Sequence, residues 1–108
     1  MSTYAVAHLH SVTMCPAIVE YLERIDATLA PFNGRFVVHG GPTELLEGRW
    51  DGDLVVIEFP DRECAREWYG SPAYQAILPL RTQHSVGDVI LIDTVEAPHR
   101  ATDVLQRD

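Results

Sequence analysis

The stretch that decides the fold is residues 34–81, which read GRFVVHGGPTELLEGRWDGDLVVIEFPDRECAREWYGSPAYQAILPLR. It begins with a predicted strand, Arg35–His39, which a Gly-Gly-Pro corner ends sharply. A hairpin arm is expected over Thr43–Trp50, and Asp51-Gly52 is a turn signal that leads into a strong strand, Leu54–Phe59. The stretch therefore predicts neighbouring strands joined by an arm.

Two helices are predicted in the second half of this stretch. Asp61 can cap a helix that runs to about Tyr69, because its carboxylate can accept a backbone N–H of the first turn. Ser71-Pro72 repeats the signal, with proline at the first helical position. Pro79 removes a backbone donor, so we expect it to kink or interrupt the second helix.

The flanking sequence completes the order of elements. We expect a strand over Tyr4–Val12, an amphipathic helix over Pro16–Ala30 and a last strand over Asp88–Val95. This βαββαβ order predicts an α+β, ferredoxin-like domain over residues 1–96, with an antiparallel sheet and helices on one face. Residues 97–108 show no sustained pattern and are expected to form a C-terminal tail, flexible or packed on a partner.

The central strands predict how the domain associates. Leu54–Ile57 and Val89–Ile92 are apolar at every position, whereas a sheet with one wet face should alternate. Helices cover one face, so something else must cover the other. A second copy of the same sheet is the simplest candidate, which predicts a two-fold homodimer with a barrel-like core.

Composition excludes several classes of partner. The 108 residues carry a formal charge of −8, and all 8 basic residues are arginines. Such a surface repels phosphate backbones and anionic lipid, so we expect neither nucleic-acid nor membrane binding. Cys15 and Cys64 form no disulfide framework, and no stretch resembles a signal peptide or a membrane span. A soluble, cytoplasmic protein is expected.

The middle of the chain resembles the domain of unknown function 1330 family, within the dimeric α+β-barrel superfamily. The positions that carry the resemblance are Gly34, Phe36, Gly40, Gly41, Leu46-Glu47-Gly48, Trp50, Val56-Ile57-Glu58-Phe59-Pro60, Trp68-Tyr69, Ser71-Pro72, Tyr74 and Arg81. The resemblance implies the ferredoxin-like fold and the dimer. The superfamily includes cofactor-free monooxygenases, isomerases, cyclases and haem enzymes, so it raises the expectation of a small-molecule pocket and no more. Two positions depart from the family pattern: His39 replaces a common arginine, and Cys15 replaces a common acidic residue.

One constellation suggests a ligand site. Three aromatic residues gather near one helical region: Trp68, Tyr69 and Tyr74. Together with Arg81 they could wall a pocket in which the guanidinium binds a carboxylate, enolate or phenolate. The alternative is that the aromatic residues fill the core and Arg81 pairs with Glu58 or Glu47.

Other candidate residues are less specific. Glu58, at the end of an apolar strand, could be a general base with a raised pKa, or the ion-pair partner of an arginine. His39 is a second candidate base. Glu47 and Trp50 follow the family pattern and are candidate ligand contacts, although Glu47 could simply close the hairpin through an arginine.

No metal or organic cofactor is expected. His8 and His10 lie two residues apart on one strand face and could chelate zinc, but the sequence places no third ligand beside them. The Gly-Gly corner precedes a hairpin rather than a helix, so it is not a phosphate loop. The sequence therefore supports two hypotheses: a homodimeric, cofactor-independent enzyme acting by proton transfer, isomerisation, cyclisation or oxygenation on a small, partly apolar metabolite, and a non-catalytic dimeric ligand-binding or interaction module.

Overall fold

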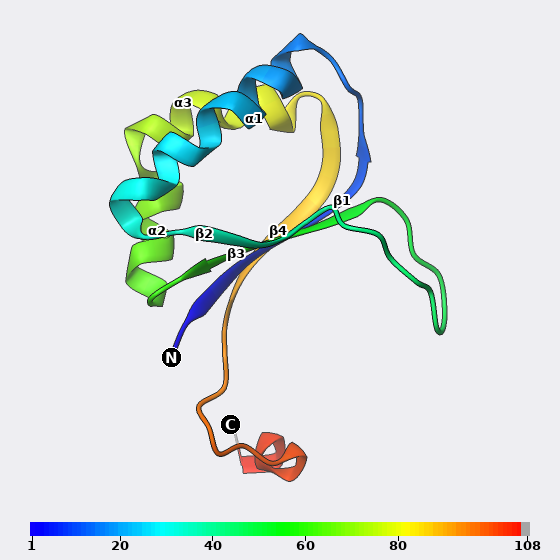
Figure 1. Ribbon diagram of the computed structural model, residues 1–108, viewed down its shortest axis with the longest axis vertical. Coiled ribbons are helices and arrows are strands. Elements are labelled where there is room, and N and C mark those ends of the chain that lie inside the picture. Colours follow the sequence, from blue (N-terminus) through cyan, green and yellow to red (C-terminus); the bar gives the residue numbers. More distant parts are fainter. Residues whose placement is uncertain (107–108) are drawn as a thin grey trace.

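The computed structural model describes residues 1–106 and has the predicted α+β, ferredoxin-like order of elements (Figure 1). The elements are β1 (Thr3–Val12), α1 (Pro16–Leu29), a 3-10 turn (Ala30–Phe32), β2 (Arg35–His39), β3 (Asp53–Phe59), α2 (Arg62–Gly70), α3 (Pro72–Thr82), β4 (Ser85–Asp93) and a second 3-10 helix (Ala101–Gln106). Among the described residues, no helix is long and apolar enough to span a bilayer.

The strands form one antiparallel sheet in the order β2-β3-β1-β4, with β1 in the centre. The helices pack on one face of this sheet, and the other face carries none of them (Figure 1). The last strand begins at Ser85, earlier than the expected Asp88, because a register shift in β1 lets Val12 pair with Ser85. Side chains of β1 alternate between the two faces, which assigns neighbouring residues to different environments.

The core lies between the helices and the covered face of the sheet. Ala5 and Ile57, which are directly opposite each other on β1 and β3, pack against α1. Phe59 and Ile77 are fully buried, and Ile25 is almost so. The apolar positions of α1 that recur at helical spacing are therefore the ones that meet the sheet.

The two predicted helix caps are confirmed. The Asp61 carboxylate accepts the Cys64 backbone N–H, and the Ser71 hydroxyl accepts the Tyr74 N–H. The predicted interruption at Pro79 is wrong, because α3 continues through Pro79 to Thr82. Proline removes one backbone donor and crowds the carbonyl one turn earlier, yet the helix continues, and the Pro79 carbonyl accepts the Gln83 N–H in the last turn.

Two segments extend away from this body. Residues 40–52 form an arm between β2 and β3, as expected, but this arm contains no strand and the hairpin expected over Thr43–Trp50 does not form. The chain after β4 leads away to the short 3-10 helix at Ala101–Gln106, far from α1 (Figure 1). The Cα radius of gyration, 15.4 Å, exceeds the roughly 13 Å of a compact domain of this length. The arm and the C-terminal segment account for this extended shape.

Candidate functional site

A cavity of about 290 Å³ lies between the covered sheet face and the helices. The sheet lines it with small and aliphatic side chains, among them Ala7 of β1 and Val55 of β3. Ile18 of α1 lines the opposite wall. The small β1 residues leave this space because the helices rest on the larger side chains around them. The chamber is mostly apolar, and its polar and charged lining residues are Tyr21, Tyr74, Arg81, His39 and Asp53.

Three polar side chains meet at the helical wall of the cavity. The hydroxyls of Tyr21 and Tyr74 are hydrogen-bonded to each other at 2.7 Å, and the Arg81 guanidinium lies 5.8 Å from the centre of the Tyr21 ring. All three residues line the cavity. Burial, reinforced by the neighbouring Tyr74, raises the pKa of the Tyr21 phenol, so this hydroxyl is neutral at physiological pH. The arginine is therefore the charged group of this cluster.

Arg81 has no acidic partner within the part of the chain that the structure describes. None of the ion pairs among residues 1–106 includes it, and the carboxylates suggested as partners, Glu58 and Glu47, lie elsewhere. Its neighbours are the faces and hydroxyls of two tyrosines, which a guanidinium favours but which do not neutralise it. A partly buried cation at an apolar cavity is suited to an anionic ligand.

The predicted aromatic residues divide between core and cavity. Trp68 lines the cavity and is also a buried core residue. Its indole N–H donates to the Thr28 hydroxyl at 3.0 Å. Tyr74 likewise belongs to both. Tyr69 packs beside them with its ring centre 5.5 Å from that of Tyr74, but it does not line the cavity. His39 does line it, stacked on Phe36 with 4.4 Å between ring centres.

The structure does not bring the predicted glutamates to this cavity. Glu58 pairs in register with Tyr4 and lies on the uncovered face of the sheet, where it forms an ion pair with Arg35. Glu58 is thus the ion-pair partner of an arginine, one of the two roles expected for it, but its expected proximity to Arg81 is wrong, because residue 58 alternates away from the helices. Glu47 and Trp50 belong to the arm. Trp50 stacks on His8 instead, with ring centres 4.1 Å apart.

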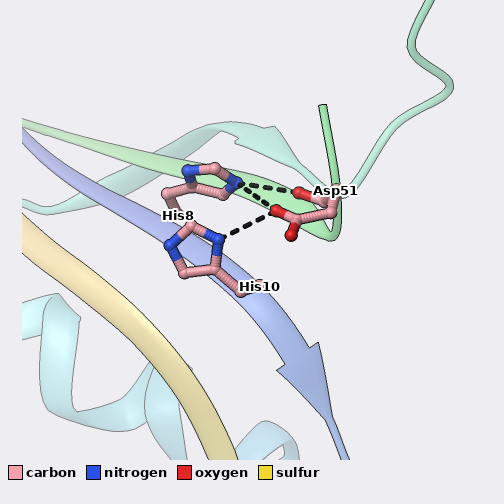
Figure 2. A group of neighbouring side chains, drawn as sticks. All are labelled: His8, His10 and Asp51. Atoms are coloured by element: carbon pink, nitrogen blue, oxygen red, sulfur yellow. Dashed lines mark hydrogen bonds and ion pairs between the residues drawn. The ribbon is translucent and has the colours of Figure 1, made fainter. Parts of the chain in front are cut away.

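A second cluster lies on the uncovered face, where His8 and His10 of β1 meet Asp51 of the arm (Figure 2). His10 Nδ1 is 2.8 Å from Asp51 Oδ1, and His8 Nε2 is 3.4 Å from the same oxygen. His10 Nε2 is 3.1 Å from Asp88 Oδ2 on β4. Hydrogen bonds to Asp51 and Asp88 raise the pKa of His10, and the bond from His10 lowers that of Asp51.

Sequence reasoning missed two residues of these sites. Tyr21 has only the helical spacing of a core residue, and nothing in that pattern indicates a hydroxyl at a cavity. Asp51 reads as a turn residue, and its contact with His8 depends on how the arm folds back. The Asp-Gly pair predicts a turn, but the sequence does not show that this turn brings Asp51 to the histidines of β1.

Comparison with known proteins assigns the chain to a family. The sequence matches the family described as domain of unknown function (DUF1330) over residues 2–95. The chain belongs to this family. The resemblance based on the glycine, tryptophan and tyrosine pattern is thereby confirmed. No curated protein matches the chain.

Solved structures share the fold of this family member. A protein of unknown function from Rhodopseudomonas palustris aligns with a TM-score of 0.63 and 18% identity, covering 88% of this chain and 83% of that one. A dimeric ferredoxin-like protein of unknown function from a Jannaschia species aligns with a TM-score of 0.66 and 10% identity, over 87% of this chain and 100% of that one. SnoaB, a cofactor-independent oxygenase from Streptomyces nogalater, aligns as a mutant with a TM-score of 0.61 and 21% identity, over 91% and 98% of the two chains. At these identities the likeness shows the fold alone.

Proposed function

We propose that this chain is a homodimeric protein that binds a small, partly apolar anion in the cavity between its helices and sheet. The observation that carries the proposal is Arg81, a partly buried guanidinium at an apolar cavity without a carboxylate partner among residues 1–106. The cavity volume, about 290 Å³, lies at the lower end of the range of ligand sites, about 300–1,000 Å³. An aromatic carboxylate, a phenolate or an enolate would match both its size and its charge.

The dimer in this proposal forms through the uncovered sheet face. Val38, Ile90 and Ile92 lie on that face and are 38%, 54% and 50% exposed in the single chain. A contiguous apolar surface of this kind on a soluble domain indicates an interface. Solved structures with this fold are described as dimeric ferredoxin-like proteins, which supports a second copy as the occupant.

Within this proposal, cofactor-independent enzymatic chemistry is the first candidate. His39 would take a proton from a bound enolisable compound, and Arg81 would stabilise the resulting enolate oxygen. Returning the proton to another atom gives isomerisation, and attack of the enolate carbon within the same molecule gives cyclisation. Oxygenation is a further reaction within this proposal, because SnoaB, which has the same fold, is described as a cofactor-independent oxygenase. The second candidate is a binding module that holds the same ligand without turnover.

Ligand binding can be tested with a panel of small aromatic acids, phenols and diketones. In a Trp50→Phe background the remaining tryptophan, Trp68, lines the cavity and should report binding by fluorescence. A ligand at one hundred times its dissociation constant should add about 2.7 kcal/mol to the free energy of unfolding. Arg81→Ala should abolish that gain and remain folded, while Arg24→Ala, on the surface with Glu20, should keep it. An unchanged affinity in Arg81→Ala would refute the proposed site.

Turnover is tested separately with any compound that binds. Oxygen uptake and deuterium exchange in heavy water would detect oxygenation and proton transfer. His39→Gln should lose turnover while it retains binding if His39 is the base. Binding without turnover by the unmodified chain would favour the module.

A further inference from the structure

We propose that His8, His10 and Asp51 form a binding site for a divalent first-row transition-metal ion such as Zn²⁺. The three side chains offer two imidazole nitrogens and one carboxylate oxygen, all within 4.8 Å of one another. These are ligand types that zinc uses in proteins. Figure 2 shows the two rings and the carboxylate pointing toward a common point. The site lies across the sheet from the cavity, on the face that we propose as the dimer interface, and takes no part in ligand binding within the cavity.

The backbone places these ligands together. Residues 8 and 10 alternate to the same face of β1, so both rings project from one side of the strand. The arm supplies the third ligand at a turn whose glycine, Gly52, has a φ of +74°. A Cβ atom at Gly52 would lie 1.8 Å from the carbonyl oxygen of Leu9. Only glycine lets the arm approach β1 closely enough to bring Asp51 to the histidines.

Two of the three separations between ligand atoms can be compared with those of a tetrahedral ion, and all three lie within 4.8 Å. Metal bonds of about 2.0–2.1 Å separate two ligand atoms of a tetrahedral zinc site by roughly 3.3 Å. His8 Nε2 and Asp51 Oδ1 are 3.4 Å apart, and His10 Nδ1 and the same oxygen are 2.8 Å apart. The second distance must open slightly, which the exposed Asp51 side chain allows. His8 Nε2 now donates to the Asp51 carbonyl oxygen at 2.8 Å and must lose that proton to bind a metal.

Neighbouring groups orient the two imidazoles. The Trp50 ring stacks flat on His8, with an angle of 1° between the planes. Asp88 accepts from His10 Nε2 at 3.1 Å, so Nδ1 faces the site, and the hydrogen bond that Nδ1 now donates to Asp51 must be replaced by the metal with loss of that proton. A carboxylate on the far nitrogen is the usual partner of a metal-binding histidine, because it fixes the tautomer and the ring orientation. The two aspartates and the chain's formal charge of −8 also favour a cation here.

The experiment uses the untagged full chain, freed of metal with EDTA and then dialysed. Titration with Zn²⁺ in a calorimeter should give one ion per chain, and Co²⁺ should produce visible bands of a four-coordinate site with nitrogen and oxygen ligands. His8→Ala, His10→Ala and Asp51→Ala should each weaken Zn²⁺ binding at least tenfold. Asp88→Asn should weaken it by about 10–100-fold through loss of the outer carboxylate.

A matched control uses another histidine–aspartate pair, found in the C-terminal part of residues 1–106. His99 Nδ1 lies 3.8 Å from Asp103 Oδ2, so His99→Ala removes a paired imidazole that does not belong to the cluster. That variant should bind Zn²⁺ as the unmodified chain does. Circular dichroism would confirm that each variant is folded. Absence of one-to-one binding, or unchanged affinity in both His10→Ala and Asp51→Ala, would overturn the proposal and leave the cluster as hydrogen bonds that hold the arm.

Discussion

At the scale of single residues, the tyrosine pair at the cavity is the most sensitive feature. Tyr21 and Tyr74 each supply the hydrogen-bond partner of the other in a buried position. Tyr21→Phe should therefore cost about 1–3 kcal/mol of unfolding free energy, because it leaves the Tyr74 hydroxyl without this partner. The double variant with Tyr74→Phe should cost less than the sum of the two single changes. Urea denaturation of the unmodified chain, the two single variants and the double variant measures this coupling. If the two single losses simply add up in the double variant, the coupling is absent.

Single residues also show how far the sequence could predict the site. Trp68, Tyr74 and Arg81 were predicted together, and they line one cavity because the amphipathic pattern of α2 and α3 fixes which side faces the sheet. Glu58 was misplaced. Its sequence neighbours are apolar on both sides, so alternation alone does not tell which face of β3 the helices cover. Which face of β3 is covered depends on where the helices pack in the folded chain.

At the scale of elements, the arm depends on one glycine. Gly52→Ala should be strongly destabilising at the turn, because the new Cβ would lie 1.8 Å from the Leu9 carbonyl oxygen. Gly48→Ala is the matched control, with a similar φ of +78° but nothing within 4 Å of a new Cβ. The control should show only the conformational cost, roughly 1–2 kcal/mol. Equal losses of unfolding free energy in the two variants would show that the arm does not press on β1.

The cap between α2 and α3 gives a second test at this scale. The Ser71 hydroxyl accepts from Tyr74 N–H and donates to the Trp68 carbonyl oxygen at 2.7 Å. Ser71→Ala should cost about 1 kcal/mol of unfolding free energy. Chemical denaturation would measure the loss, and Ser71→Thr, which retains a hydroxyl, should recover part of it. No loss in Ser71→Ala would mean that water replaces the cap.

The elements themselves were largely predictable, and the exceptions have physical causes. The caps at Asp61 and Ser71 mark α2 and α3 through chemistry that acts within a few residues. Pro79 was expected to kink or interrupt α3, but the helix continues through it to Thr82, so the surrounding packing offsets the local cost of the proline. The hairpin arm over Thr43–Trp50 was expected beside the Asp51-Gly52 turn signal, but among the described residues the arm forms no strand and pairs with none.

At the scale of the whole molecule, the proposed dimer predicts a simple change of mass. Size exclusion with light scattering at micromolar concentration should give twice the chain mass. Ile90→Asp, on the uncovered sheet face, should dissociate and destabilise the protein together, because it would bury a charge at the interface. Val19→Asp, at a similarly exposed position of α1 (46% against 54% for Ile90), should leave the mass unchanged. A monomeric unmodified chain would refute the dimer.

Acid stability is a second property of the whole fold. A hydrogen bond from Thr3, followed by contacts with Arg62, lowers the pKa of Asp93 where β1 begins and β4 ends. The folded pKa lies below the unfolded value of about 3.9, so this stabilisation is present above that pH and is lost as the pH falls through the folded pKa. Asp93→Asn should therefore reduce stability at neutral pH and make acid unfolding less steep between about pH 5 and 3. Denaturation at a series of pH values measures how the free energy of unfolding depends on pH. If the slope is the same in Asp93→Asn as in the unmodified chain, the contact does not stabilise the fold.

The alternation of β1 has a consequence for how this family member can evolve. Ala5, Ala7 and Leu9 face the cavity, while His8 and His10 face the other way. Point substitutions can therefore alter one site and leave the other intact, so ligand preference and ion affinity can drift separately. A single inserted or deleted residue within β1 would exchange the two sets at once. We expect lineages to accumulate replacements along this strand freely and length changes there hardly ever, with length variation confined to the arm.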